Sequence, residues 1–388
     1  MPKYSGGHRD VPPDVPVMTP IESHDMIALE ADSPTQPEIM AGRRNSRGLR
    51  LDPSGLANKS GRLPSVAVLE GLQDRSVRSQ ADLSRTEVIE LCRLGALMEA
   101  NDVASHHPLD GKLVITAFFE ASTRTRLSFE SAVLRLDGKV LSVPDGSVTG
   151  TAKGESLADI GEMFNSYGDL VVMRHPATEA LDDLSSGLDL PLINAGNGSG
   201  EHPTQALVDW FALLKWRPEL ASDELPEDQR IHLGIVGTPG NMRAVKSFLL
   251  RSLDFAPAIR KLTVISEMAD PFGDVLDDPT NLGCEVEITN EAAPAVPEFD
   301  VIYMNSIALL GDSYQLLGEQ YRLDADSHLK PEAVIMHPLA RRDELDTSLD
   351  ETEHNLYFAQ AAGATYVRQA LLTSLLGRVD RLPFMNGS

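Results

Sequence analysis

The chain has 388 residues, of which 42% are hydrophobic, and its formal net charge is −24 at pH 7. A chain of this length can fill the cores of two ordinary domains. A surface this acidic repels phosphate polymers, so no general affinity for nucleic acid or for an anionic membrane is expected. An anionic substrate would have to be bound by a local cluster of arginines.

The two cysteines, Cys92 and Cys284, lie in apolar contexts and lack the neighbours of a zinc or redox motif. No metal is therefore expected, and a reducing, cytoplasmic setting fits best. The sequence has no run of about eighteen apolar residues, and its N-terminus lacks a basic start followed by an apolar stretch. Neither a membrane span nor a signal peptide is predicted.

Residues 1–63 are rich in Pro, Gly, Ser, Asp and Arg, which favours a flexible N-terminal extension over a regulatory or docking segment. Order is predicted from Ser84, which can cap a helix whose third residue is Glu87. The apolar residues that follow, through Leu94, recur at helical spacing. A first folded domain has therefore begun by this point.

Apolar runs and helical periodicity then alternate, as expected for a parallel α/β sheet. The run 113–119 is predicted to be a buried strand, and helical spacing follows over 122–136. The remaining elements of this domain are three strands and a long helix that leads out of it: 140–143, 170–173, 192–194 and 203–215.

A second alternating series begins after the acidic loop 218–229. It contains a helix over 243–253 and five predicted strands: 231–236, 262–266, 286–289, 301–304 and 333–336. A final helical stretch, 357–376, is long enough to return to the first domain. We predict an α/β fold with two doubly wound parallel-sheet domains, the first formed by residues 64–216 with 356–384 and the second by residues 217–355.

The predicted turn from strand to helix reads Phe-Phe-Glu-Ala-Ser-Thr-Arg-Thr-Arg-Leu-Ser-Phe-Glu over 118–130. Its hydroxyl groups, backbone N–H groups and the Arg124 guanidinium can donate to one phosphate, and the helix dipole adds to this attraction. A simple N-cap needs one such hydroxyl and no paired arginines. The segment therefore predicts a phosphate site.

Two further segments carry polar side chains that suit the same cleft. His202 and Gln205 lie three residues apart at the start of a helix and share one face, so one can donate to a carbonyl oxygen while the other recognises an amide. Arg174 comes just past a strand end, where open α/β sheets bind ligands.

These three segments, in this order, resemble the aspartate and ornithine carbamoyltransferase family, and more closely its aspartate branch. The resemblance runs from about Ser84 to Gly377 and includes later segments at 300–304, 337–339 and 367–372. It implies an enzyme that transfers the carbamoyl group of carbamoyl phosphate to an amine without metal, cofactor or covalent intermediate.

The resemblance also implies roles for individual residues. Arg174 and His202, with Thr125, would polarise the carbonyl group of carbamoyl phosphate, while Gln205 and the backbone carbonyl of Leu339 would recognise its amino group. The phosphate would be bound by three hydroxyl groups and a guanidinium: Ser122, Thr123, Arg124 and Thr125.

Two more positions match family residues that act between subunits or between domains. Lys153 matches a lysine that the family lends to the active site of a neighbouring subunit, which implies a homotrimer. Glu120 resembles the residue that holds the domains closed by pairing with an arginine across the cleft.

The acceptor side departs from the aspartate branch. Ser306 and Ala308 stand where that branch has an arginine for the side-chain carboxylate of aspartate and a glutamine, and Ala340 replaces a proline. Arg243 still matches the arginine for the α-carboxylate, although it is followed by Ala244. Because loss of a cationic partner costs about 2–5 kcal/mol, we expect a carboxylate-bearing amine other than aspartate as acceptor.

Two alternatives stay open. Aspartate itself is the acceptor if another cation binds its side chain, and Arg341 and Arg342 are candidates. A non-catalytic protein that binds carbamoyl phosphate or an amino acid is the other alternative, which the retained Arg124, Arg174 and His202 disfavour.

Overall fold

A computed structural model of the chain describes residues 47–58, 63–101, 103–276, 282–305, 307–310, 313–316 and 321–385. The predicted extension 1–63 lies mostly outside these residues. Its described part differs from the expectation, because helix α2 (Ser54–Ala57) packs on two later helices and the Leu56 side chain is fully buried. Burial of that leucine joins residues 47–58 to the folded unit.

The first sheet has four parallel strands in the order β2-β1-β3-β4. Alternate side chains of β1 point to opposite faces: Val114 and Phe118 lie in one apolar cluster, and Ile115 and Ala117 in another. The strands are β1 (Leu113–Phe118), β2 (Lys139–Val143), β3 (Leu170–His175) and β4 (Leu192–Asn197).

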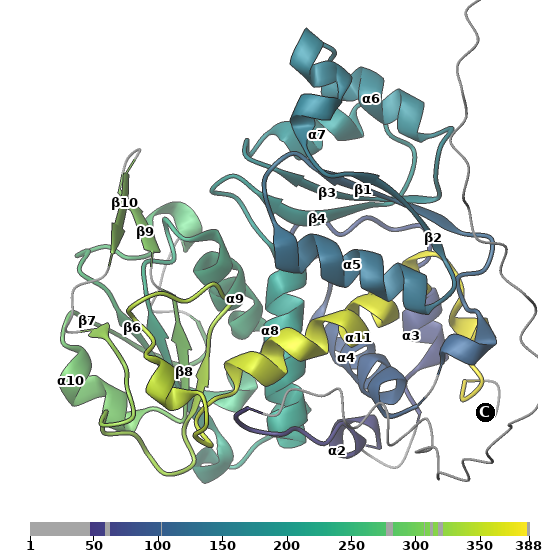
Figure 1. Cartoon of the computed structure of the whole chain (residues 1–388). Helices are drawn as coiled ribbons and strands as arrows, with labels where there is room; N and C mark the ends of the chain where they lie inside the picture. Colours follow the sequence, from purple (N-terminus) through teal and green to yellow (C-terminus); the bar gives the residue numbers. More distant parts are fainter. Residues whose placement is uncertain are drawn as a thin grey trace, which may run out of the picture. The chain divides into compact units, whose positions relative to one another are not determined.

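Helices cover both faces of this sheet (Figure 1). One face carries α6 (Leu157–Phe164) and α7 (Ala180–Ser185), whose apolar side chains join Ile115. The other face packs against a larger group of helices: α3 (Val66–Glu70), α4 (Arg85–Ala100), α5 (Thr123–Arg135) and α8 (Pro203–Trp216). The predicted start of α4 is confirmed, because Ser84 and Glu87 form a capping box.

The second sheet has five parallel strands in the order β11-β8-β5-β6-β7. Its helices are α9 (Arg243–Asp254) and the short α10 (Ala292–Ala295). The strands are β5 (Ile231–Val236), β6 (Ile259–Ile265), β7 (Glu285–Thr289), β8 (Val301–Met304) and β11 (Val334–Met336). The predicted α/β fold with two parallel sheets is confirmed, whereas its division into two domains stays a prediction.

An antiparallel hairpin, β9 (Ile307–Leu310) with β10 (Ser313–Leu316), follows β8 and was not predicted. The long helix α11 (Tyr357–Leu375) then runs back from the second sheet to pack on α4, α5 and α8 (Figure 1). No helix in the described part of the chain is both long and apolar enough to span a membrane.

Candidate active site

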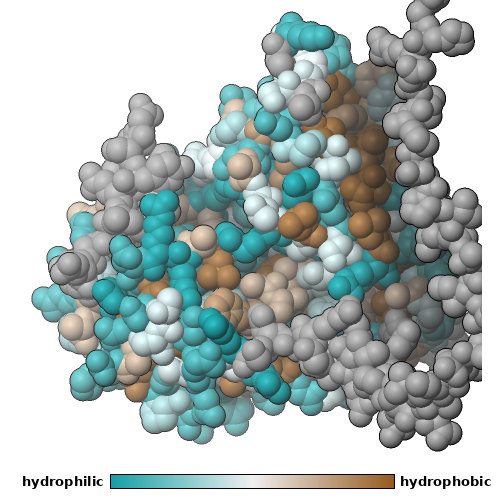
Figure 2. All heavy atoms as spheres, in the orientation of Figure 1, coloured by the Kyte–Doolittle hydropathy of each residue, from teal (hydrophilic) through white to brown (hydrophobic). Residues whose placement is uncertain are grey.

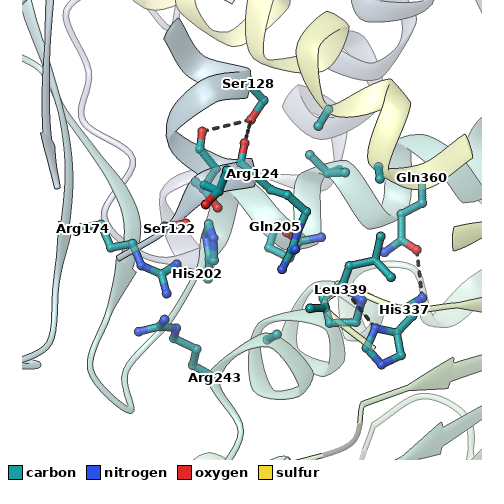
Figure 3. Close-up of a pocket in the computed structure, with 18 of the residues that line it drawn as sticks. Ser122, Arg124, Ser128, Arg174, His202, Gln205, Arg243, His337, Leu339 and Gln360 are labelled. Atoms are coloured by element: carbon teal, nitrogen blue, oxygen red, sulfur yellow. Dashed lines mark hydrogen bonds between the residues drawn. The ribbon is translucent and has the colours of Figure 1, made fainter. Parts of the chain in front are cut away.

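A cavity of about 470 Å³ opens where α5, α8, α9 and α11 meet the end of β3 and the loops after β8 and β11 (Figure 3). Its lining residues run from Ala121 to Arg368, because α11 returns to the first sheet. Ten of the residues predicted from sequence line it: Ser122, Thr123, Arg124, Thr125, Arg174, His202, Gln205, Arg243, Leu339 and Ala340.

The N-terminus of α5 forms one wall of the cavity. Ser122 is the N-cap residue in an extended conformation, and its side chain makes no capping hydrogen bond. The first N–H groups of the helix and the hydroxyl groups beside them can therefore donate to an anion. Burial lowers the pKa of Arg124 from its ordinary value, yet an arginine keeps its charge at neutral pH.

Glu120 joins two arginines of the cavity wall. Its carboxylate accepts a hydrogen bond from Arg174 Nη2 at 3.1 Å and two from Arg243, at 3.1 and 3.2 Å. Burial opposes ionisation of Glu120, but hydrogen bonds and charge from Arg243 and Arg174 outweigh it and lower the pKa of this carboxyl. Arg174 lies within the last residues of β3, not just past its end as predicted, because the strand extends to His175. Arg243 begins α9, so Glu120 links elements of both sheets.

His202 is buried at the start of α8, between the two sheets. Its backbone N–H donates to Ser247 Oγ at 2.8 Å, which fixes the residue against α9. Burial, together with the positive charges of Arg174, Arg243 and Arg368, holds the pKa of His202 well below its ordinary value. The imidazole is therefore neutral at neutral pH and can donate one N–H to a carbonyl oxygen.

This depressed pKa predicts how stability depends on pH. As pH falls below about 6.5, the unfolded chain takes up a proton on His202 before the folded chain does, so the free energy of unfolding falls. Replacing His202 by glutamine should make this fall shallower, by at most about 1.4 kcal/mol per pH unit. Urea unfolding of both proteins at pH 5, 6 and 7.5 measures the slopes, and equal slopes would contradict the prediction.

The structure adds residues that the sequence analysis had not assigned to the site. Arg368 of α11 is buried, lies over the Phe129 ring with 4.5 Å from the guanidinium carbon to the ring centroid, and donates to Ser128 Oγ. Burial lowers its pKa to about 9, so it stays charged at neutral pH. The other polar additions from the cavity wall are Ser128, Asn305, His337 and Gln360.

His337 fixes the loop that carries Leu339. The backbone N–H of Leu339 donates to His337 Nδ1 at 2.8 Å, so the other ring nitrogen carries the proton and donates to Glu344 at 2.9 Å. The backbone N–H of His337 donates to Gln360 Oε1 at 3.0 Å, which ties the loop to α11 (Figure 3). Leu339 can thus present its carbonyl oxygen to the cavity from a fixed position.

Some predicted site residues lie elsewhere. Lys153 is exposed at the end of a 3₁₀ helix (Gly150–Lys153) and does not line the cavity of its own chain. Ser306 lies outside the described residues, and of Ala308 only the backbone, in β9, is described. The candidate cation Arg341 instead pairs with Asp350 and Tyr357, away from the cavity.

Known proteins resemble this chain over most of its length. The family model described as aspartate/ornithine carbamoyltransferase, carbamoyl-P binding domain, matches residues 75–215, and the model of the Asp/Orn binding domain matches 231–375. The aspartate carbamoyltransferase catalytic subunit of Picrophilus torridus is 34% identical over 319 residues, which cover 79% of this chain and 99% of that protein. The subunit with the same name from Chromobacterium violaceum is 36% identical, and the match covers 69% of this chain and 87% of that one.

A solved structure shares the same fold. Aspartate transcarbamoylase from Trypanosoma cruzi, crystallised with carbamoyl phosphate and aspartate, superposes with a TM-score of 0.68 at 29% identity. The match covers 79% of this chain and 98% of that protein.

Proposed function

This chain belongs to the aspartate/ornithine carbamoyltransferase family and is a carbamoyltransferase, and from that premise we propose that it transfers the carbamoyl group of carbamoyl phosphate to L-aspartate. Phosphate is the second product. Residues 64–216 with 356–384 bind the donor in this proposal, and residues 217–355 bind the acceptor.

The expectation of an acceptor other than aspartate is wrong. The relatives from Picrophilus torridus, Haloquadratum walsbyi and Methanopyrus kandleri, at 32–34% identity over most of this chain, are all named aspartate carbamoyltransferase. The expectation rested on the replacement of the family's arginine and glutamine by Ser306 and Ala308. It did not count Arg368, which α11 brings to the cavity wall.

The charge of the cavity wall carries the proposal. Four guanidinium groups line it, those of Arg124, Arg174, Arg243 and Arg368, and no acidic side chain is among the described residues of the wall. Glu120 offsets one of these charges through its ion pairs with Arg174 and Arg243, and Lys153 of a neighbouring subunit adds one in the proposed trimer. Carbamoyl phosphate brings about two negative charges and the carboxylates of aspartate bring two more. A dicarboxylate acceptor therefore balances this wall better than a monocarboxylate does.

The reaction follows from orientation and electrostatics. The neutral amine of aspartate attacks the carbamoyl carbon, the new C–N bond forms, and the bond from that carbon to the phosphate oxygen breaks. Arg174 and neutral His202 donate to the carbonyl oxygen as negative charge develops on it. The leaving phosphate keeps the bonding electron pair, is stabilised by Arg124 and the N-terminus of α5, and can accept the proton of the amine.

A homotrimer completes the site in this proposal. Apolar side chains that are exposed in the single chain lie on α5, at Leu127 and Leu134, and on the edge strand β2, at Leu141. Figure 2 shows hydrophobic surface on this side of the first sheet. A neighbouring subunit that covers this surface could supply Lys153, which does not line the cavity of its own chain.

The acceptor test measures phosphate release with L-aspartate and with L-asparagine, which differs only in the second carboxylate. Loss of a buried ionic partner costs about 2–5 kcal/mol, so kcat/KM for aspartate should exceed that for asparagine roughly thirtyfold or more. Succinate, a dicarboxylate without an amine, serves as the control and should inhibit competitively against aspartate. Equal use of asparagine, or no inhibition by succinate, would contradict aspartate as the acceptor.

A further inference from the structure

We propose that Asp209 is a positioning residue that fixes the Gln205 amide with its carbonyl oxygen toward the carbamoyl group. The proposal rests on the donor half of the proposed function, because it needs carbamoyl phosphate in the cavity. It does not depend on which amine is the acceptor.

Asp209 is a fully buried carboxylate on α8, one helical turn after Gln205. Its Oδ1 atom accepts hydrogen bonds from Gln205 Nε2 at 2.7 Å and from Gln360 Nε2 at 2.6 Å. Its Oδ2 atom accepts one from the Tyr303 hydroxyl at 3.0 Å. Asp209 therefore binds side chains from α8, α11 and β8 at one point.

The backbone of His337 determines which way these amides point. A backbone N–H can only donate, so the atom of Gln360 that lies 3.0 Å from His337 N must be its carbonyl oxygen. The NH₂ group of Gln360 then faces Asp209, and Oδ1 must be an acceptor. Gln205 reaches the same oxygen, so it too presents its NH₂ group to Asp209.

This arrangement selects the amide atom that Gln205 can offer to a ligand. Gln205 lines the cavity, and with its NH₂ group bound to Asp209 its carbonyl oxygen is the atom left to accept a hydrogen bond. The amino group of carbamoyl phosphate is a matching donor. If the Gln205 amide were flipped, its NH₂ group would face the amino group of carbamoyl phosphate, and two hydrogen-bond donors would oppose each other.

The second contact to the carbamoyl amino group depends on the same carboxylate. Asp209 holds Gln360, Gln360 holds the backbone of His337, and His337 Nδ1 accepts from the N–H of Leu339. Both groups proposed to recognise the amino group, the Gln205 amide and the Leu339 carbonyl, are therefore connected to Asp209 by hydrogen bonds.

Asp209 could instead act through the negative charge of its ionised form. Burial raises its pKa to about 7, against hydrogen bonds from Gln205, Gln360 and Tyr303 and the positive charge of Arg368. The two roles predict different results for asparagine at this position. Asparagine keeps one acceptor oxygen for the two glutamine amides and can turn its NH₂ group to Tyr303, but it has no charge.

The test compares carbamoyl phosphate with acetyl phosphate, which has a methyl group in place of the amino group, and with inorganic phosphate. Calorimetry on the full chain without acceptor gives three dissociation constants for wild type, Asp209→Leu and Asp209→Asn. In Asp209→Leu the preference for carbamoyl over acetyl phosphate should fall about tenfold, the equivalent of one hydrogen bond. Phosphate affinity should not change, and Asp209→Asn should keep the wild-type preference.

Matched variants separate positioning from a merely structural role. Tyr303→Phe removes the bond to Oδ2 and leaves Oδ1 untouched, so it should keep the wild-type preference. If Asp209→Leu does not fold, Asp209→Ala removes the acceptor without pressing methyl groups on the amides and should lower the preference equally.

The proposal would be overturned if the folded Asp209→Leu or Asp209→Ala variant kept the wild-type preference for carbamoyl over acetyl phosphate. It would also be overturned if Asp209→Asn lost as much of that preference as Asp209→Leu. Affinity lost equally for all three ligands would also overturn it. A wild-type chain without any preference for carbamoyl over acetyl phosphate would instead contradict the assigned roles of Gln205 and Leu339.

Discussion

Replacing Arg174 by alanine is expected to lower kcat by about 10²–10³-fold, which is the usual cost of losing one preorganised donor to a developing oxyanion. Arg174 is largely buried at the end of β3 and is fixed by Glu120 at 3.1 Å and by the Ala195 carbonyl at 3.4 Å. A guanidinium fixed in this way needs little reorganisation when charge develops on the carbonyl oxygen. Steady-state phosphate release at saturating substrates measures the effect.

Two variants serve as controls for this result. Arg260→Ala removes an exposed arginine from β6 and should leave kcat unchanged. Arg174→Lys keeps the charge but loses the planar fork, so we expect an intermediate kcat. A fall of less than about tenfold in a folded Arg174→Ala protein would show that Arg174 does not bind the oxyanion.

Mixing two weakly active variants should restore activity if sites are shared between subunits. Lys153→Ala should itself lower kcat/KM by about tenfold to a hundredfold, because a charge-assisted hydrogen bond to the phosphate is lost. In trimers reassembled from equal amounts of Lys153→Ala and Arg174→Ala, about one site in four receives an intact Arg174 from one chain and an intact Lys153 from the next. Activity should then rise to about a quarter of wild type.

The controls are each variant taken alone through the same dissociation and reassembly, and a mixture of Arg174→Ala with Arg124→Ala. Arg124 and Arg174 line the cavity of the same chain. An intact site would therefore need a chain that carries neither substitution, and the mixture of the two variants contains no such chain. Its activity should stay at the mean of the two parents. If the Lys153 mixture also stays at that mean, Lys153 acts within its own chain or not at all.

The sequence by itself determined the local elements. The capping box of Ser84 and Glu87, the apolar run that forms β1 and the hydroxyl-rich start of α5 all depend on neighbours within a few residues. Spacing of 2.0 or 3.6 residues decides which side chains face a core, so the strands of both sheets and the helices α4, α5, α8, α9 and α11 could be predicted.

Contacts between distant residues were decided only by the tertiary structure. Gln360 lies 151 residues after Asp209, and Arg368 lies 240 residues after Ser128, so no local pattern could pair them. The positive charge of the cavity wall depends on such contacts between distant residues, because Arg368 reaches the wall only when α11 packs on α5. The expectation of another acceptor, which rested on the changes at Ser306 and Ala308, did not include this arginine and was wrong. Local spacing determines which face of an element is buried, but only the packed chain determines which charges and hydrogen-bonding groups share one cavity.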